Sequence, residues 1–133
     1  MFDSVALRAR LAGVRERIAR AATRAGRDPA SVRLIAVSKT FSADHVRAAA
    51  DAGHLDFGEN KVQEALQKMQ QTSDLPLRWH LIGHLQSNKA RKAAQFHTIH
   101  SIDDAAHAAK FEPRVRFVEV SGTCPDCVAR RKA

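Results

Sequence analysis

Leu34-Ile35-Ala36-Val37-Ser38-Lys39-Thr40 is the stretch that decides the fold of this chain. Its run of four apolar residues is typical of a buried strand, and the run stops abruptly at a serine and a lysine. Ser42 then predicts the cap of a helix that continues to about Ala52, with Gly53 just past its end. A strand, a polar turn and a helix make half of a βαβ unit, and such folds keep their chemistry in the turn.

Lys39 is the first candidate functional residue, because it follows a strand that we expect to be buried. An ammonium that is partly desolvated loses its proton more easily and becomes a nucleophile that can form an imine. The alternative interpretation is a lysine at a strand end that points into water. This segment alone leaves both interpretations open.

Composition indicates one ordinary globular domain, with 133 residues, 44% of them hydrophobic and 27% charged. No apolar run approaches the length of a membrane span, and residues 1–25 carry arginines where a signal peptide needs an apolar stretch. We therefore expect a cytoplasmic protein with no membrane segment.

The formal net charge of +8 is concentrated at the two ends of the sequence. Residues 1–27 hold seven arginines against two carboxylates, and residues 110–133 hold six basic residues against three acidic ones. Basic ends are one requirement for binding a phosphate backbone. However, the chain has six Phe, one Trp and no Tyr, and few of these flank the arginines. The pattern favours solvated helix faces over a nucleic-acid interface.

Hydrophobic periodicity predicts an amphipathic helix over residues 4–25, which Gly26 ends, before the first strand. Further short strands are predicted over residues 54–57, 77–82, 97–102 and about 114–120. Together with residues 34–38, these strands alternate with short helices. We expect them to be parallel and adjacent in chain order.

Polar turns follow each of these strands. In Gly58-Glu59-Asn60 the glycine suits a tight turn, and Asn60 is expected to cap the next helix while offering an amide to a ligand. Residues 83–89 carry His84, Gln86 and Asn88, and Ser87 or Asn88 is the expected cap of a helix over residues 89–95. Asp103 is the expected cap of a short alanine-rich helix.

This repetition predicts an α/β fold with a parallel sheet and outer helices. No Gly-x-Gly-x-x-Gly follows the first strand, which argues against a dinucleotide-binding sheet. A (β/α) barrel fits better, because polar residues at the end of every strand converge on one rim.

Four strings of residues occur in order and at close spacing: Val37-Ser38-Lys39-Thr40, Phe57 to Glu64 (FGENKVQE), Trp79 to Lys89 (WHLIGHLQSNK) and His100-Ser101-Ile102-Asp103. Together they resemble the amino-terminal half of the pyridoxal phosphate homeostasis proteins, the YggS/PROSC family. The resemblance covers roughly residues 3–104.

The resemblance implies the amino-terminal part of a (β/α)₈ barrel similar to the barrel domain of alanine racemase, with pyridoxal 5′-phosphate as cofactor. It implies that Lys39 carries the cofactor as a Schiff base, an internal aldimine. Val37, Asn60, His80 and Gly83 are implied to line the cofactor end of the barrel. It also implies storage or delivery of the cofactor, with apo forms of enzymes that use it as candidate partners. The alternatives are an amino-acid racemase-like enzyme, disfavoured by the absence of tyrosine, and a basic nucleic-acid-binding module.

The sequence departs from a full barrel after about residue 105, which we interpret as a truncation or frameshift, with a natural half-barrel that pairs with another copy as the alternative. Residues 1–110 are predicted to form a partial barrel domain and residues 111–133 a divergent tail. Barrels of this kind commonly bind phosphate through the loops after strands 7 and 8. We therefore expect weak cofactor retention, and self-association through unpaired sheet edges.

Cys124 and Cys127 form a Cys-x-x-Cys pair in the tail. Zinc needs four ligands, and only six residues follow Cys127 with no second pair. The pair is therefore predicted to be incidental, and no metal site is expected.

Overall fold

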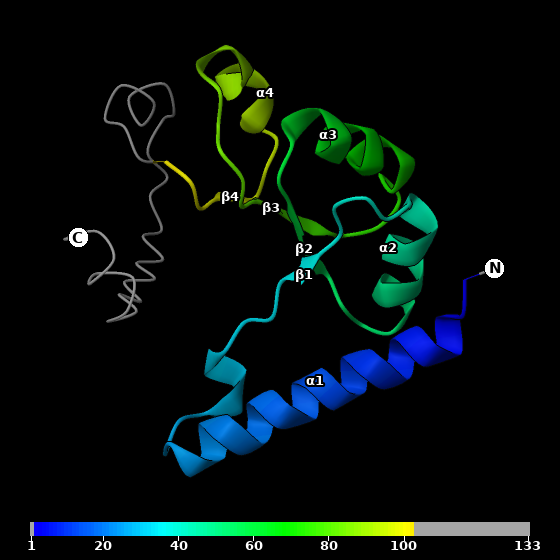
Figure 1. The fold of residues 1–133 in the computed structure, drawn as a ribbon, viewed down its shortest axis with the longest axis vertical. Helices are drawn as coiled ribbons and strands as arrows, with labels where there is room; N and C mark the ends of the chain where they lie inside the picture. The colour runs from blue at the N-terminus through cyan, green and yellow to red at the C-terminus, as the bar shows by residue number, and fades with distance from the viewer. Residues whose placement is uncertain (1, 103–133) are drawn as a thin grey trace, which may run out of the picture.

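The computed structural model describes residues 2–102 of the chain (Figure 1). The predicted fifth strand over residues 114–120, the helix capped by Asp103, the tail domain and the Cys124–Cys127 pair lie outside the described residues. Within residues 2–102, no helix is both long and apolar enough to cross a membrane.

Four short strands form one sheet, in the order β1-β2-β3-β4, and every neighbouring pair is parallel. The strands are β1 (Ala36–Val37), β2 (Asp56–Glu59), β3 (Arg78–Leu81) and β4 (Thr98–Ile99). The predicted order and direction are therefore confirmed for these four strands. Three of them are shorter than predicted, and β2 is shifted toward the carboxyl end, although residues just outside the strands, such as Ser38 and His100, also donate backbone hydrogen bonds to the neighbouring strand.

Helix α1 (Ser4–Arg24) and the 3₁₀ turn η1 (Pro29–Ser31) precede β1. Helices α2 (Ala43–Asp51), α3 (Val62–Gln71) and α4 (Ala90–Ala93) follow β1, β2 and β3 as expected, with a 3₁₀ turn η2 (Ser87–Lys89) before α4. The Asp3 side chain caps α1 by accepting from the amides of Val5 and Ala6. Gly26 and Gly53 lie beyond the ends of α1 and α2, with φ of +68° and +85°. Both positions need the left-handed conformation that glycine adopts without steric cost, as the sequence predicted.

Three local predictions about the turns are wrong. Asn60 does not cap α3, because the chain stays extended for one more residue and Lys61 takes the cap position. Ser87 and Asn88 belong to η2, so the N-cap of the following helix is Lys89, and that helix ends at Ala93. Gly58 lies inside β2 and makes no turn.

The two faces of the sheet differ in what covers them. Residues that pair across parallel strands point to the same side, and successive residues alternate. Ala36, Phe57 and Trp79 are paired in this way, and they pack with the apolar sides of α2, α3 and α4 to form the core. Val37, Gly58 and His80 are also paired, and they face the side of the sheet away from these helices.

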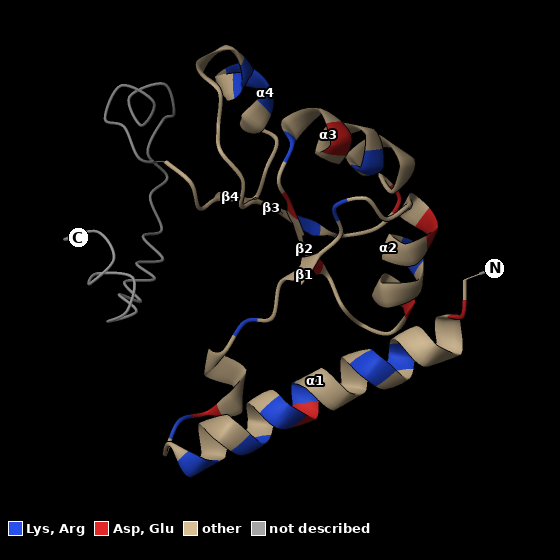
Figure 2. Ribbon diagram, viewed as in Figure 1, with Lys and Arg blue, Asp and Glu red and all other residues tan. Residues whose placement is uncertain are grey.

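Helix α1 lies along one side of this unit and contacts α2 and η1 (Figure 1). Leu7 packs against the core, whereas Ala22 is the one fully buried residue of α1. Figure 2 shows the basic residues spread along its outer surface. This arrangement agrees with the predicted amphipathic helix whose arginines are solvated.

Candidate functional site

Lys39 lies two residues after the end of β1, and its side chain is exposed. It makes no hydrogen bond or ion pair with any residue between 2 and 102. Of the two interpretations that the sequence left open, residues 2–102 therefore show the lysine that points into water. The reason is that β1 is an edge strand of the described sheet, and nothing described there covers it: Val37, two residues earlier, is 47% exposed.

The backbone on both sides of Lys39 is firmly held. The Ser38 amide donates to the carbonyl of Gly58 over 3.0 Å, and the Ser38 hydroxyl donates to Glu59 Oε1 over 2.6 Å. The Ser38 carbonyl accepts from Lys68 Nζ. On the other side, the Thr40 amide donates to Glu64 Oε1 over 2.8 Å. An exposed amine therefore stands on a loop whose backbone is fixed.

These contacts come from one ionic cluster beneath the loop, formed by Glu59, Glu64 and Lys68. Lys68 Nζ lies 2.6 Å from Glu59 Oε1 and 3.0 Å from Glu64 Oε1. Glu59 is completely buried and Lys68 is 5% exposed. Such buried pairs add little net stability over apolar residues, but losing one partner is costly. The cluster therefore specifies one arrangement of the loop.

Two further details concern the loop and the cluster beneath it: one strained backbone conformation and one buried carboxylate oxygen without a hydrogen-bond partner. Thr40 has φ of +67°, a left-handed conformation that is unfavourable for a β-branched residue. Glu59 Oε2 is buried and has no hydrogen-bond partner within residues 2–102. The hydrogen bond from the Thr40 amide, followed by the one from Lys68, lowers the pKa of Glu64. Glu64 is thus held as a carboxylate that can keep both contacts.

A second polar cluster lies on the sheet face away from the helices. Arg78 binds Asp56 with two hydrogen bonds, from Nε over 2.8 Å and from Nη2 over 2.7 Å. His80 Nε2 lies 2.9 Å from Asp56 Oδ1, and His80 Nδ1 lies 3.0 Å from His100 Nε2. The hydrogen bond from Arg78, supported by the one from His80, holds the pKa of Asp56 far below its usual range.

This geometry fixes the tautomers of the two histidines when both are neutral. A carboxylate only accepts, so His80 donates from Nε2 to Asp56 and its Nδ1 must accept from His100 Nε2. Burial lowers the pKa of His80, which is 1% exposed, and partial burial lowers the pKa of His100. The cluster orders the carboxyl ends of β3 and β4.

Asn60 and Gly83 meet at the carboxyl ends of β2 and β3. A β-carbon added at Gly83 would lie 2.3 Å from the Asn60 carbonyl oxygen, so this close approach requires glycine. The Gly83 carbonyl accepts a hydrogen bond from the Ser101 hydroxyl. Gly83 therefore has a structural reason to stand in the motif, beside any contact with a ligand.

The structure brings the predicted site residues together only in part. Val37 and His80 share the sheet face away from the helices, and continued alternation along the chain assigns Lys39 to that face too. Asn60 and Gly83 contact each other. Among the described contacts, none joins Lys39 to Asn60, His80 or Gly83.

Sequence reasoning missed the roles of Glu59, Glu64, Lys68 and Asp56. One signal was present: Glu64 and Lys68 are four residues apart on a predicted helix, the spacing at which opposite charges pair. That spacing gives no indication that Lys68 reaches the backbone of Ser38, 30 residues away.

Comparisons with known proteins found similar proteins, although no family model matches the chain. The chain is 56% identical to the pyridoxal phosphate homeostasis protein of Pseudomonas aeruginosa over 94 residues, which cover 70% of this chain and 41% of that protein. It is 50% identical to the protein of the same name from Escherichia coli over 97 residues, covering 70% and 42%. The chain is therefore similar to part of the pyridoxal phosphate homeostasis proteins.

Solved structures show the same similarity. PipY of Synechococcus elongatus, in a structure with PLP bound, is 52% identical and matches with a TM-score of 0.60 over 70% of this chain and 45% of that chain. A protein of unknown function from Bifidobacterium adolescentis is 34% identical, with a TM-score of 0.72 over 83% and 51%. The chain thus spans about two fifths of its curated relatives, and its four strands form the amino-terminal part of a barrel-like α/β fold. Both curated relatives are named for cofactor homeostasis, and neither is named as a racemase or a nucleic-acid-binding protein.

Proposed function

We propose that the chain takes part in pyridoxal phosphate homeostasis by holding pyridoxal 5′-phosphate covalently at Lys39. The observation that carries this proposal is an exposed amine on a loop fixed from both sides, through Ser38 and Thr40. The solved relative with PLP bound, 52% identical to this chain, supports it independently.

The residues present are compatible with such a cofactor. Its aldehyde reacts with a free amine, and the Lys39 amine has no partner between residues 2 and 102 that would compete for it. Val37 offers half-exposed apolar surface on the same face of the sheet. His80, fixed by Asp56, and the packed Asn60–Gly83 backbone are the remaining proposed lining residues.

The other lysines of the described region are less suitable. Lys68 is buried and bound by two carboxylates and a carbonyl, so its amine is not available for reaction. The other lysines stand at helix ends or on helix surfaces: Lys61, Lys89 and Lys92. None of them lies on a loop that is fixed by hydrogen bonds on both sides, as Lys39 is through Ser38 and Thr40. Covalent loading is therefore expected at one position.

The test is to incubate the chain with pyridoxal phosphate, reduce it with borohydride and map the adduct by peptide mass spectrometry. Lys39→Arg should abolish the adduct, and Lys61→Arg, a matched control in the neighbouring motif, should leave it unchanged. Adduct spread evenly over Lys61, Lys89 and Lys92 contradicts the proposal.

Cofactor delivery, self-association and cellular location are further proposals about the function. The names of the relatives support a role in cofactor homeostasis, and we propose delivery to apo enzymes, without substrate turnover, as the form of that role. Self-association through the edges at β1 and β4 is supported by their place at the ends of the described sheet. Dialysis of the loaded chain measures the predicted weak retention, and sedimentation measures association. A cytoplasmic location is also a proposal.

A further inference from the structure

Helix α1 is held to the rest of the fold by few contacts. Leu7 packs against the core, and Ala22 is the one fully buried residue of the helix. Within the described part of the chain, Arg15 is the one residue of α1 whose side chain forms hydrogen bonds outside that helix. The docking of α1 against α2 and η1 therefore depends on what Arg15 binds.

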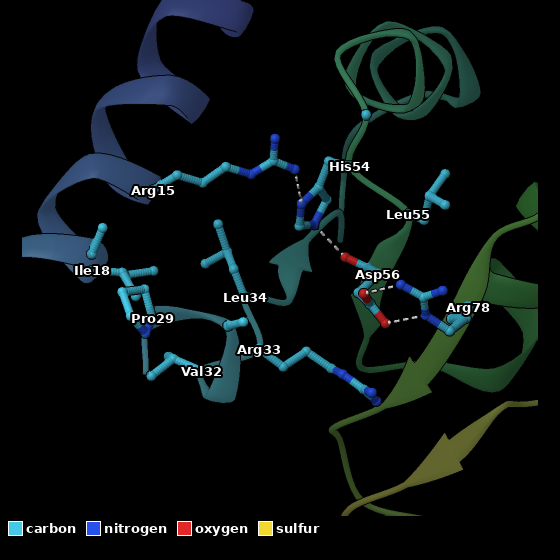
Figure 3. A pocket seen from close by; sticks show the side chains of 13 residues that line it. Arg15, Ile18, Pro29, Val32, Arg33, Leu34, His54, Leu55, Asp56 and Arg78 are labelled. Atoms are coloured by element: carbon cyan, nitrogen blue, oxygen red, sulfur yellow. Dashed lines mark hydrogen bonds and ion pairs between the residues drawn. The ribbon is translucent and has the colours of Figure 1, made fainter. Parts of the chain in front are cut away.

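Arg15 binds a histidine that in turn binds the sheet. Figure 3 shows the Arg15 side chain directed from α1 at His54, two residues before β2. Arg15 Nη2 lies 3.1 Å from His54 Nδ1, and Arg15 Nη1 donates to the carbonyl of Ala52, just past the end of α2, over 3.4 Å. On the other side of the ring, His54 Nε2 lies 2.6 Å from the carbonyl oxygen of Asp56. One imidazole thus connects α1 to β2.

These contacts require a neutral His54. An arginine only donates and a carbonyl only accepts, so the ring accepts at Nδ1 and donates from Nε2. A proton added at Nδ1 would point at the Arg15 guanidinium and place two cations side by side. His54 is 3% exposed, so water has little access to a protonated ring in this position. Protonation of His54 and its contact with Arg15 therefore exclude each other.

The surroundings of His54 favour the neutral form. Burial lowers the pKa of His54 from 6.5, and the positive charges of Arg15 on α1 and Arg78 on β3 lower it further. The hydrogen bond to the Asp56 carbonyl and the charge of the Asp56 carboxylate raise it, but Arg78 already binds that carboxylate with two hydrogen bonds. The contact of His54 with α2 is through the backbone, from the His54 amide to the Ala49 carbonyl.

The same contacts border a cavity of about 500 Å³ between α1, η1 and the first residues of β2 and β3 (Figure 3). Ile18 of α1 faces this cavity together with Leu34 and Leu55. Arg33 is the one charged lining residue besides those that surround His54. Release of α1 would remove one wall of the cavity and expose its apolar lining.

We propose that the Arg15–His54 contact makes the docking of α1 sensitive to pH: α1 stays docked while His54 is neutral and is released when His54 binds a proton. The inference is independent of Lys39 and does not rest on the proposed function. The docked form lowers the pKa of His54, so the released form binds the proton more tightly. Docking is therefore fully favoured above pH 6.5 and weakens as the pH falls below it.

Hydrogen exchange of the 133-residue chain, measured by mass spectrometry at pH 7.5 and 5.5, tests this proposal. A helix of this length is marginally stable in water by itself, so its amides lose protection after release. One pH unit below 6.5 favours the released form by at most about tenfold. Protection factors, which correct for the effect of pH on intrinsic exchange, should therefore fall about three- to tenfold more in residues 12–22 than in α3.

Two variants remove the contact in different ways. Arg15→Gln removes the guanidinium, so residues 12–22 should have reduced protection already at pH 7.5 and show no additional fall at pH 5.5. His54→Gln leaves a polar side chain that does not titrate, so the additional fall in α1 should disappear.

Three control variants should behave as the original chain does. Arg17→Gln makes the same charge change on the exposed surface of α1. His45→Gln removes the other histidine near the start of α1, whose ring centroid lies 4.2 Å from that of Phe2. His80→Gln removes a titrating histidine from the other polar cluster. The proposal is overturned by equal falls in α1 and α3, by an additional fall that persists in His54→Gln, or by unchanged protection of α1 in Arg15→Gln at pH 7.5.

Discussion

Gly83 and Asn60 touch through their backbones: a β-carbon at Gly83 would lie 2.3 Å from the Asn60 carbonyl oxygen and 2.7 Å from its α-carbon. Contacts of that length do not occur between non-bonded atoms, so the two turns after β2 and β3 fit together only with glycine at this position. The contact aligns the carboxyl ends of two neighbouring strands. Lys39 lies at the same end of the sheet.

Gly83→Ala is therefore expected to destabilise the fold. The new methyl group meets backbone atoms, which move less easily than a side chain, so we expect a loss of about 1–3 kcal/mol in the free energy of unfolding. Urea titration measures it. Gly13→Ala is the matched control: its β-carbon would meet nothing within 4 Å, and α1 should gain about 0.5–1 kcal/mol from the better helix former. Equal effects of the two substitutions would contradict this account.

Lys68→Met tests the buried ionic cluster. The substitution leaves the Glu59 carboxylate buried without its cation, and we expect a loss of about 3–5 kcal/mol in the free energy of unfolding. The double variant Glu59→Gln/Lys68→Met removes the unpaired charge and should be more stable than Lys68→Met alone. If the double variant is the less stable of the two, the cost lies in packing and the charge argument fails.

Much of the fold was predictable from sequence because its signals are local. The apolar runs and the glycines at positions 26 and 53 indicated four strands and the ends of two helices, and all four strands are parallel and in chain order. The helix caps were misassigned because Asn60 and Asn88 are good cap residues by type, whereas the actual boundary depends on how far each strand continues.

The candidate site was less predictable, because burial and pairing depend on what the rest of the fold places nearby. The neighbours of Lys39 in sequence left its exposure open, because exposure is decided by the edge position of β1. The contact of Lys68 with Ser38 joins residues 30 positions apart. A pattern search along the chain has no means of finding such a contact.

Stability should fall as the pH is lowered below about 6.5. The pKa values of His54, His80 and His100 are all lowered in the folded state from 6.5, mainly by burial. Unfolded histidines therefore bind protons at a higher pH than folded ones. The stability they contribute is complete above pH 6.5 and is lost as the pH falls towards their folded pKa values. Urea titrations at pH 7.5, 6.5 and 5.5 should show this slope.

His80→Gln provides the control for the pH effect. Glutamine can still donate to Asp56 but does not titrate, so the slope between pH 7.5 and 5.5 should become shallower. An unchanged slope would mean that other groups cause the effect.

Below about pH 3.8 a further loss of stability is expected. The pKa of Asp56 is lowered by Arg78 in the folded state, so the unfolded carboxylate is protonated first.

Glu64→Ala should loosen the loop that carries Lys39 without unfolding the domain. Glu64 Oε1 accepts from the Thr40 amide at 2.8 Å, and Thr40 keeps its unfavourable φ of +67° while that bond is in place. Loss of a hydrogen bond to a charged group should raise the exchange rate of the Thr40 amide about tenfold or more, measurable by NMR. Glu64→Gln keeps an acceptor for Thr40 and should exchange more slowly than the alanine variant. Gln63→Ala, an exposed change on the same helix, should leave the rate unaltered. If the Thr40 amide of Glu64→Ala exchanges at the original rate, the loop is held through Ser38 alone, and the hydrogen bond from Thr40 to Glu64 does not fix it.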